Sequence, residues 1–412
     1  MNVYVHFPFC RAKCAYCALL SRAGTSSEAR TAYVARLVRE LASRGLSPSD
    51  EGGLSPKSRG LSPSDEGGLS PNQRGLSPSD AGGLSPNSRG LSPVETVYFG
   101  GGTPALCDLS EIKLNLASDY EFTVELHPQD ATDARLAELR RLGVNRISLG
   151  VQSFDDAALT AMGRGHTAVE AEAAFRRVQA VFPNSGLDLI AGWPGTSEAS
   201  WRTTIARALA LESVHISCYT LIREPKTRLD LAVRQGRVVL PDDDAALAQV
   251  DLARAAFAAA GLRRYEVSNY ARPGFECRHN CAVWRGEDYL GFGEGAHGRE
   301  GLARTVGQAE GYEVTTVTPE EDALERALLG LRTSAGLDLA RVARAWPRLA
   351  PRLSAWRAVL ASLVAPGILA ETAPDVFVPT DRGFEVCDAV MAELLSAPAA
   401  DVSSNKGTGL SK

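Results

Sequence analysis

Short apolar runs alternate with amphipathic stretches along most of the chain. Each run is four or five residues long, which is typical of a buried strand, and the stretches between the runs carry apolar residues at helical spacing. The predicted strands are Val3–Phe7, Thr96–Phe99, Phe122–Glu125, Arg146–Leu149, Leu187–Ile190 and Val214–Ser217. The predicted helices between them include Glu28–Leu41, Asp133–Leu142, Val169–Phe182 and Glu198–Leu211.

Six strand–helix units in series predict an α/β fold. Parallel neighbouring strands need crossover connections, and the helical stretches supply them. Six such units that curve on one another predict a partial (β/α)6 barrel of the TIM type. Its functional face is then expected at the C-terminal ends of the strands.

The pattern changes after about residue 320, where the elements become shorter. The predicted helices there are Glu321–Leu331, Leu337–Ala345 and Leu353–Val364, followed by a strand at Val376–Val378 and a helix through Val390. This change predicts a small, separate α+β domain over residues 320–395.

Residues 44–93 form a repeat that does not fit the strand–helix pattern. A 15-residue unit starts at Arg44, Arg59, Arg74 and Arg89, and Gly, Ser and Pro dominate it. Its only sizeable apolar residue is Leu, so each unit buries too little apolar surface to offset its chain entropy. We predict a disordered insertion, for which the simplest account is a repeat expansion tolerated in a loop, and a disordered tail over residues 396–412.

Charge and cysteine usage narrow the functional class. The 412-residue chain has a net charge of -5, which gives no basic footprint for nucleic acid. Its eight Cys are mostly scattered, and Met1 leads directly into the first strand rather than into a secretory or membrane-spanning segment. We therefore expect a cytoplasmic protein in a reducing compartment.

Cys10, Cys14 and Cys17 follow the first predicted strand in a C-x3-C-x2-C spacing. Three thiolates on one loop can ligate three irons of a [4Fe–4S] cluster and leave the fourth iron open to a chelating small molecule. A structural zinc site would need a fourth ligand nearby. His6 is close in sequence, but its strand position is expected to direct it away from a site on the loop. A disulfide does not suit the reducing compartment.

Polar and glycine residues stand at the ends of the following predicted strands. Gly100, Gly101, Gly102 and Thr103 follow the second strand, and the glycines could offer N–H groups to a ligand. The later strand ends carry Glu125, Gln152 and Asp188, which are groups suited to ribose hydroxyls or an amino group. Each could instead cap its own strand, but strand caps alone do not account for a polar set at so many strand ends.

These motifs together resemble one subfamily of the radical S-adenosylmethionine (SAM) superfamily. The residues that carry the resemblance are Tyr-x-His-x-Pro-Phe-Cys from Tyr4, Phe-Gly-Gly-Gly-Thr-Pro from Phe99, Gly-Val-Asn-Arg-Ile-Ser-Leu-Gly-Val-Gln-Ser-Phe from Gly143 and Gly-Arg-x-His from Gly163. The subfamily contains the oxygen-independent coproporphyrinogen III oxidases and the heme chaperone HemW. The resemblance covers about residues 1–43 and 94–395.

The resemblance implies a [4Fe–4S] cluster on the three Cys and SAM as a second cofactor. The positions that match SAM contacts are Tyr4, Gly101, Gly102, Thr103, Glu125, Gln152, Arg164 and Asp188. It also implies a radical SAM barrel over residues 1–43 and 94–220, a barrel extension over 221–319 and a winged-helix-like C-terminal domain over 320–395.

Two features favour the chaperone branch over the oxidase branch. The oxidases carry a further Cys two places after the third one, where this chain has Leu19, and they have an N-terminal extension before the first strand. The segment from His279 to Trp284 resembles the His-Asn-x-x-Tyr-Trp signature of the chaperones, with Val283 in place of Tyr. An imidazole can ligate heme iron, and an indole can stack on a macrocycle, so His279 and Trp284 are the candidate heme contacts. His279 could also be a structural polar residue, and Cys277 and Cys281 could hold a metal.

The leading hypothesis is therefore a heme chaperone that delivers heme to apoproteins. The alternative is an enzyme, a radical SAM oxidoreductase acting on coproporphyrinogen III. Either would use an electron donor such as a flavodoxin or ferredoxin. A peripheral contact with a membrane is left open.

Overall fold

A twelve-stranded mixed sheet organises most of the chain. The computed structural model describes residues 1–47 and 93–397. In those residues the strand order is β14-β13-β12-β11-β1-β4-β5-β6-β7-β8-β10-β9. The central strands are β1 (Asn2–Phe7), β4 (Val94–Gly101), β5 (Leu116–Leu126), β6 (Arg146–Gln152), β7 (Ser185–Ala191) and β8 (His215–Thr220), and all six pair in parallel. They confirm the six predicted strands and the α/β fold.

The sheet extends beyond the predicted strands at both edges. β11 (Tyr289–Phe292) pairs in parallel with the free side of β1, and an antiparallel hairpin continues from it. The added strands on that side are β12 (His297–Glu300), β13 (Ala303–Gly307) and β14 (Tyr312–Thr316), and those on the other side are β10 (Asn269–Ala271) and β9 (Arg263–Arg264). These strands are short and lack a continuous apolar run, so the hydrophobic pattern does not reveal them.

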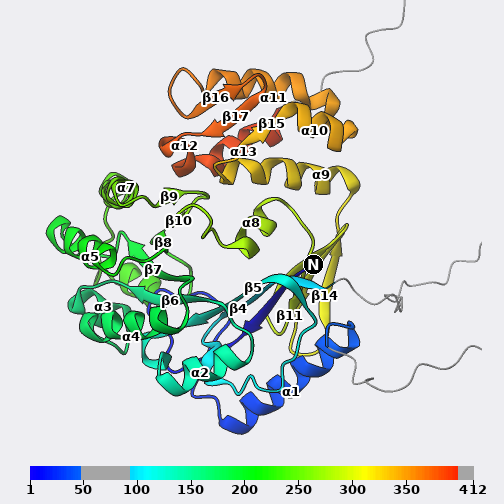
Figure 1. Ribbon diagram of the computed structural model, residues 1–412. Coiled ribbons are helices and arrows are strands. Elements are labelled where there is room, and N and C mark those ends of the chain that lie inside the picture. Colours follow the sequence, from blue (N-terminus) through cyan, green and yellow to red (C-terminus); the bar gives the residue numbers. More distant parts are fainter. Residues whose placement is uncertain (48–92, 398–412) are drawn as a thin grey trace, which may run out of the picture.

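Helices cover the outer face of the sheet (Figure 1). They are α1 (Ser27–Ser43), α2 (Asp133–Arg141), α3 (Asp156–Met162), α4 (Ala168–Val181), α5 (Glu198–Ala210) and α7 (Asp243–Ala259). A further helix, α6 (Arg228–Arg234), lies against the segment that carries the three Cys, where the Leu229 N–H donates to the Ala15 carbonyl at 2.8 Å. Side chains next to the first turn fix where these helices begin. At α4, for example, the Thr167 hydroxyl accepts from the Glu170 N–H while the Glu170 carboxylate accepts from the Thr167 N–H, which is a capping box.

The first residues of the repeat belong to the folded part of the chain. Gly45 has φ +68 just past the end of α1, and Leu46 is 1 % exposed within the main core. The Leu46 carbonyl accepts from the Asn115 N–H at 2.8 Å. The structured segment thus continues to Ser47, further than the expected boundary at residue 44. The rest of the predicted insertion, 48–92, and the tail from 398 lie outside the described residues.

The C-terminal residues form a unit with its own core. Its elements are α9 (Pro319–Leu328), η3 (Leu329–Arg332), β15 (Leu337–Asp338), α10 (Leu339–Ala345), η4 (Pro347–Leu349), α11 (Ala350–Ser362), β16 (Leu369–Ala373), β17 (Val376–Pro379), α12 (Asp381–Glu385) and α13 (Cys387–Ser396). Trp356, Leu349 and Phe377 are fully buried in a cluster separate from the sheet's core. The unit sits above α8 (Arg278–Trp284) in Figure 1.

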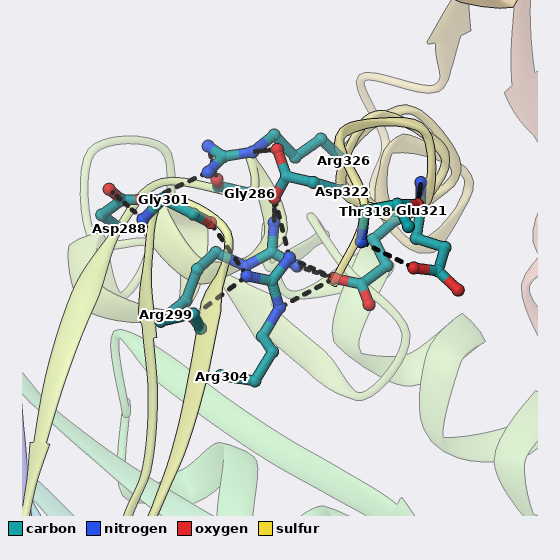
Figure 2. A network of polar contacts seen from close by, with 11 residues as sticks. Gly286, Asp288, Arg299, Gly301, Arg304, Thr318, Glu321, Asp322 and Arg326 are labelled. Atoms are coloured by element: carbon teal, nitrogen blue, oxygen red, sulfur yellow. Dashed lines mark hydrogen bonds and ion pairs between the residues drawn. The ribbon is translucent and has the colours of Figure 1, made fainter. Parts of the chain in front are cut away.

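An ion-pair network joins α9 of this unit to the β12–β13 hairpin (Figure 2). Asp322 lies 2.7 Å from Arg304 Nη2 and 2.8 Å from Arg326 Nε, and the Asp322 side chain is 14 % exposed. Glu325 lies 2.6 Å from Arg299 Nη2 and 2.7 Å from Arg304 Nη2. Because two carboxylates share three guanidinium groups in a partly buried position, the network holds the unit on the sheet better than isolated surface pairs would.

Candidate cluster and heme sites

The three Cys lie on a loop that is held at both ends. Cys10 ends β2 (Phe9–Cys10), which pairs in parallel with β3 (Arg22–Ala23) beyond the loop. The Arg22 N–H donates to the Pro8 carbonyl at 2.8 Å. Cys10, Cys14 and Cys17 are all partly exposed and line one cavity of about 560 Å³. The loop therefore presents all three thiols to the same space.

The donor set in this cavity fits a three-Cys iron–sulfur cluster. Burial raises the pKa of the Cys10 and Cys17 thiols, and the neighbouring thiols raise the pKa of Cys10 further. Arg164 Nη1 donates to Cys14 Sγ at 3.4 Å, so a guanidinium also borders the space of the three thiols. Within residues 1–47 and 93–397, no three His, Cys, Asp or Glu side chains are already gathered at metal-binding distances. A cluster would thus draw the three thiols together within their shared cavity.

The glycines at the end of β4 and just after it serve the protein's own packing. A Cβ on Gly102 would lie 2.4 Å from the Phe9 carbonyl oxygen, and Gly101 has φ +103 with His6 against it. The Gly102 and Thr103 N–H groups donate to the Phe7 and Phe9 carbonyls at 2.8 and 2.7 Å. The Gly101 N–H donates to Glu125 at 3.1 Å. The expectation that these N–H groups face a ligand is corrected, because those of Gly102 and Thr103 join the start of the cluster loop to the end of β4 and that of Gly101 binds Glu125 of β5.

All but one of the residues predicted to contact SAM line the same cavity as the thiols. Those found there are Gly101, Gly102, Thr103, Glu125, Gln152, Arg164 and Asp188. Glu125 accepts from the Tyr98 hydroxyl at 2.9 Å, and burial, together with the charge of Asp188, raises the Glu125 pKa to about 7. Burial also raises the pKa of Asp188, which accepts from the Ser148 hydroxyl at 2.9 Å.

A second, larger cavity of about 840 Å³ adjoins the first. The two share Ala18, Leu19, Glu125 and Tyr219 in their linings. The larger cavity contains Tyr4, His279 and Trp284. Tyr4 is therefore the one predicted SAM contact that does not line the cavity of the three thiols. Its hydroxyl lies 3.0 Å from His6 Nδ1.

Helix α8 and its capping residue place His279 in this larger cavity. The start of α8 has no capping side chain of its own. The Glu121 carboxylate from β5 replaces it and accepts from the N–H groups of Arg278 and His279, each at 3.1 Å. The Cys277 thiol also donates to Glu121 at 3.4 Å. This use of the buried Cys277 is a structural one.

A hydrogen-bond chain fixes the tautomer of His279. Asn2 Nδ2 donates to the Asp288 carbonyl at 3.2 Å, so Asn2 Oδ1 faces Thr96 and accepts its hydroxyl proton at 2.8 Å. Thr96 Oγ1 must then accept from His279 Nδ1–H at 2.9 Å. Burial lowers the His279 pKa to about 3. The imidazole is thus neutral, and its Nε2 lone pair is left without a proton.

Aromatic side chains and one Arg surround His279 and Trp284. The His279 ring centroid lies 5.4 Å from that of Tyr98 and 6.3 Å from that of Tyr289. The guanidinium carbon of Arg332, at the end of η3, lies 5.0 Å from the Trp284 ring centroid. The cavity therefore offers flat apolar surface around a potential iron ligand.

Several residues that build these sites carry no sequence signal. Three of them contact α8 from parts of the chain that are distant in sequence, namely Thr96, Glu121 and Arg332. His6 lines the larger cavity and not that of the three thiols. Its Nε2 lies 2.9 Å from the Leu20 carbonyl, beyond the last of the three Cys.

Comparisons with known proteins agree with this geometry. Residues 88–208 match the family model described as the radical SAM superfamily. The heme chaperone HemW of Bacillus subtilis is 34% identical over 329 residues, which span 73% of this chain and 86% of that protein. HemW of Mycobacterium tuberculosis is 31% identical over 418 residues, spanning 96% of this chain and 94% of that protein.

The chain belongs to the HemW family of radical SAM proteins. Membership implies a [4Fe–4S] cluster and SAM. Among solved structures, coproporphyrinogen III oxidase (HemN) from Escherichia coli matches with a TM-score of 0.73 at 18% identity, covering 95% of this chain and 89% of that one. That match supports the predicted radical SAM fold, an open, partial barrel.

Proposed function

We propose that this protein binds heme in the larger cavity and transfers it to apoproteins, as a chaperone of the HemW type. The observation that carries the proposal is the position of His279. Its Nδ1–H is held by Thr96, so the unprotonated Nε2 is available as an axial ligand to iron. In the described part of the chain, no hydrogen bond to this Nε2 is found.

The cavity suits a flat, largely apolar macrocycle. Its volume of about 840 Å³ lies within the range of about 300–1,000 Å³ found for small-molecule sites. Tyr4, Tyr98, Tyr289 and Trp284 line it, and aromatic side chains bury large apolar ligands well.

We assign the cofactors of the radical SAM family to the smaller cavity. Cys10, Cys14 and Cys17 would hold the [4Fe–4S] cluster, and Gly101, Gly102, Thr103, Glu125, Gln152, Arg164 and Asp188 would surround SAM, with Tyr4 further away. When bound, these cofactors supply one-electron chemistry. The two cavities share a wall, so the heme and the cluster would lie next to one another.

The partners follow from this assignment. They are heme-receiving apoproteins and, for reduction of the cluster, an electron donor such as a flavodoxin or ferredoxin. No helix in residues 1–47 or 93–397 is long and apolar enough to cross a membrane.

The second candidate is an oxygen-independent coproporphyrinogen III oxidase, because the Escherichia coli oxidase shares the fold. The same cavity could take that porphyrinogen. Leu19 stands where the oxidases have a further Cys, and it lines both cavities with a side chain that cannot ligate iron. This substitution favours the chaperone.

Anaerobic reconstitution with iron and sulfide, followed by two assays on one sample, tests the proposal. Hemin titration is expected to give a stoichiometric Soret shift in the wild type that His279→Ala abolishes. His297→Ala is the matched control, because His297 lines the same cavity but is exposed. Loss of the shift in His297→Ala alone would reassign the ligand. Decarboxylated product from coproporphyrinogen III, SAM and reductant would establish the oxidase instead.

A further inference from the structure

Arg332 brings a positive charge from the C-terminal unit into the larger cavity. Among the described residues that line it, Arg332 is the single Arg or Lys. The acidic residues of the lining are Glu125 and Glu266, and burial raises the pKa of both, which favours their neutral forms. The Arg332 guanidinium is thus the dominant fixed charge in a cavity otherwise made of aromatic, aliphatic and neutral polar groups.

The Arg332 guanidinium is held in place, but not all of its N–H groups have hydrogen-bond partners. Nη1 donates to the Asp388 carboxylate of α13, and the guanidinium carbon lies 5.0 Å from the Trp284 ring centroid. Arg332 Nε is buried and has no hydrogen-bond partner. Nη2 forms no hydrogen bond within the described residues, and an Arg guanidinium with a free donor can bind a carboxylate.

The backbone around Arg332 is also fixed against the sheet. The Arg332 carbonyl accepts from the Val267 N–H at 3.1 Å, and Thr333 forms a bridge with Glu266. The Ser334 N–H donates to the Tyr265 carbonyl at 3.0 Å. The segment after η3 therefore closes one side of the cavity, and its position depends on how the C-terminal unit docks.

We propose that Arg332 binds a carboxylate of the macrocycle, so that the C-terminal unit recognises the propionate end of the ligand while His279 ligates its iron. This inference rests on the proposed heme site and adds to it a specificity-determining residue. Trp284 links the two residues, because it lies on α8 with His279 and packs against Arg332. Ligands that keep the ring but lack free carboxylates would lose this interaction alone.

The test compares hemin with hemin dimethyl ester on the full-length, cluster-reconstituted protein. The wild type is expected to bind hemin about tenfold more tightly than the ester, which is the scale of one charge-assisted contact. Arg332→Gln is expected to reduce this preference to about onefold while leaving the affinity for the ester unchanged. Asp388→Asn is the control, because it removes the Arg332 ion pair but keeps the guanidinium, and it is expected to retain the preference.

The outcomes separate this inference from the proposed function. A wild type that binds both ligands through His279 with equal affinity would overturn the role of Arg332 and leave the heme site standing. Equal weakening of both ligands by Arg332→Gln, reproduced by Asp388→Asn, would show that Arg332 only docks the C-terminal unit, and so would also overturn the inference. Failure of the wild type to bind either ligand would overturn the heme site itself.

Discussion

The properties of single residues explain how this chain could hold heme iron. His279 is neutral, because burial lowers its pKa to about 3. Its tautomer is fixed, because Thr96 accepts its Nδ1–H. A partner on the second nitrogen is the usual device for orienting a metal-ligating imidazole. The sequence motif identified His279 as a candidate, but the motif could not predict which nitrogen is free.

Thr96→Val is expected to weaken hemin binding by about tenfold, because outer partners of a metal-ligating His contribute about 10–100-fold to affinity. Valine keeps the shape of the side chain but removes the acceptor for Nδ1–H. Soret titration of the reconstituted protein measures the change. Thr305→Val, a buried strand threonine outside the cavity lining, is the control, and an equal loss in that variant would refute the assigned tautomer.

Glu125 should make the stability of the cofactor-free protein depend on pH. Its pKa in the folded chain is about 7, above the value of about 4.3 for an unfolded chain. Between these values the folded state keeps a proton that the unfolded state has lost. The stability that Glu125 contributes is therefore fully present below about pH 4.3 and is lost as the pH rises through about 7.

Glu125→Gln cannot ionise and is expected to gain stability relative to the wild type as pH rises across this window. The gain is at most about 1.4 kcal/mol for each pH unit. Urea unfolding at about pH 5 and about pH 8 measures the difference. The exposed Glu138→Gln is the control for the substitution itself, and a flat difference for Glu125→Gln would show that the Glu125 carboxyl titrates normally.

At the scale of elements, the short helix α8 connects the heme site to the sheet. Seven residues give little helical stability by themselves. Glu121 compensates, because its carboxylate caps the helix from a strand 158 positions away from His279 in sequence. The sequence predicted β5 from its apolar run, but a contact across that separation leaves no periodic pattern to find.

Glu121→Ala is expected to lower the free energy of unfolding by about 2 kcal/mol, since it leaves buried donors unpaired. It should also weaken hemin binding, because His279 begins the helix that loses its cap. Asp119→Ala is a matched control on the same strand. Asp119 is 92% exposed and pairs with Arg278 at 3.1 Å, and such surface pairs contribute about 0.5 kcal/mol. Comparable losses in both variants would rule out a capping role for Glu121.

At the scale of the whole molecule, the six parallel strands could be predicted from the sequence. The contacts that hold the C-terminal unit on the sheet could not. The six parallel strands follow from apolar runs that are buried on both faces. The charged contacts of Figure 2 join α9 to the hairpin β12–β13, and they depend on the folding of two separate segments. Charged residues that pair across such distances look like ordinary surface charges in the sequence.

The repeat segment gives a test of the boundary found in the structure. The Asn115 N–H donates to the Leu46 carbonyl and its carbonyl accepts from the Val94 N–H, each at 2.8 Å, so one residue holds both flanks of the repeat. Deletion of residues 48–92 is expected to leave the melting temperature and the iron content after reconstitution unchanged.

Deletion of 44–93 is expected to destabilise the protein by about 2–5 kcal/mol, because it also removes the buried Leu46 side chain. Thermal unfolding of the two variants side by side decides between the boundaries. Equal stability would place the start of the dispensable segment at residue 44, and a loss of iron in the shorter deletion would make the repeat part of the cluster site.

The most direct test of the central claim is an iron anomalous difference map from crystals of the reconstituted protein with one equivalent of hemin. Two separate sites are expected, one beside Cys10, Cys14 and Cys17 and the other bonded to His279 Nε2 in the larger cavity. Heme iron located anywhere else, or ligated by another residue, would contradict the account.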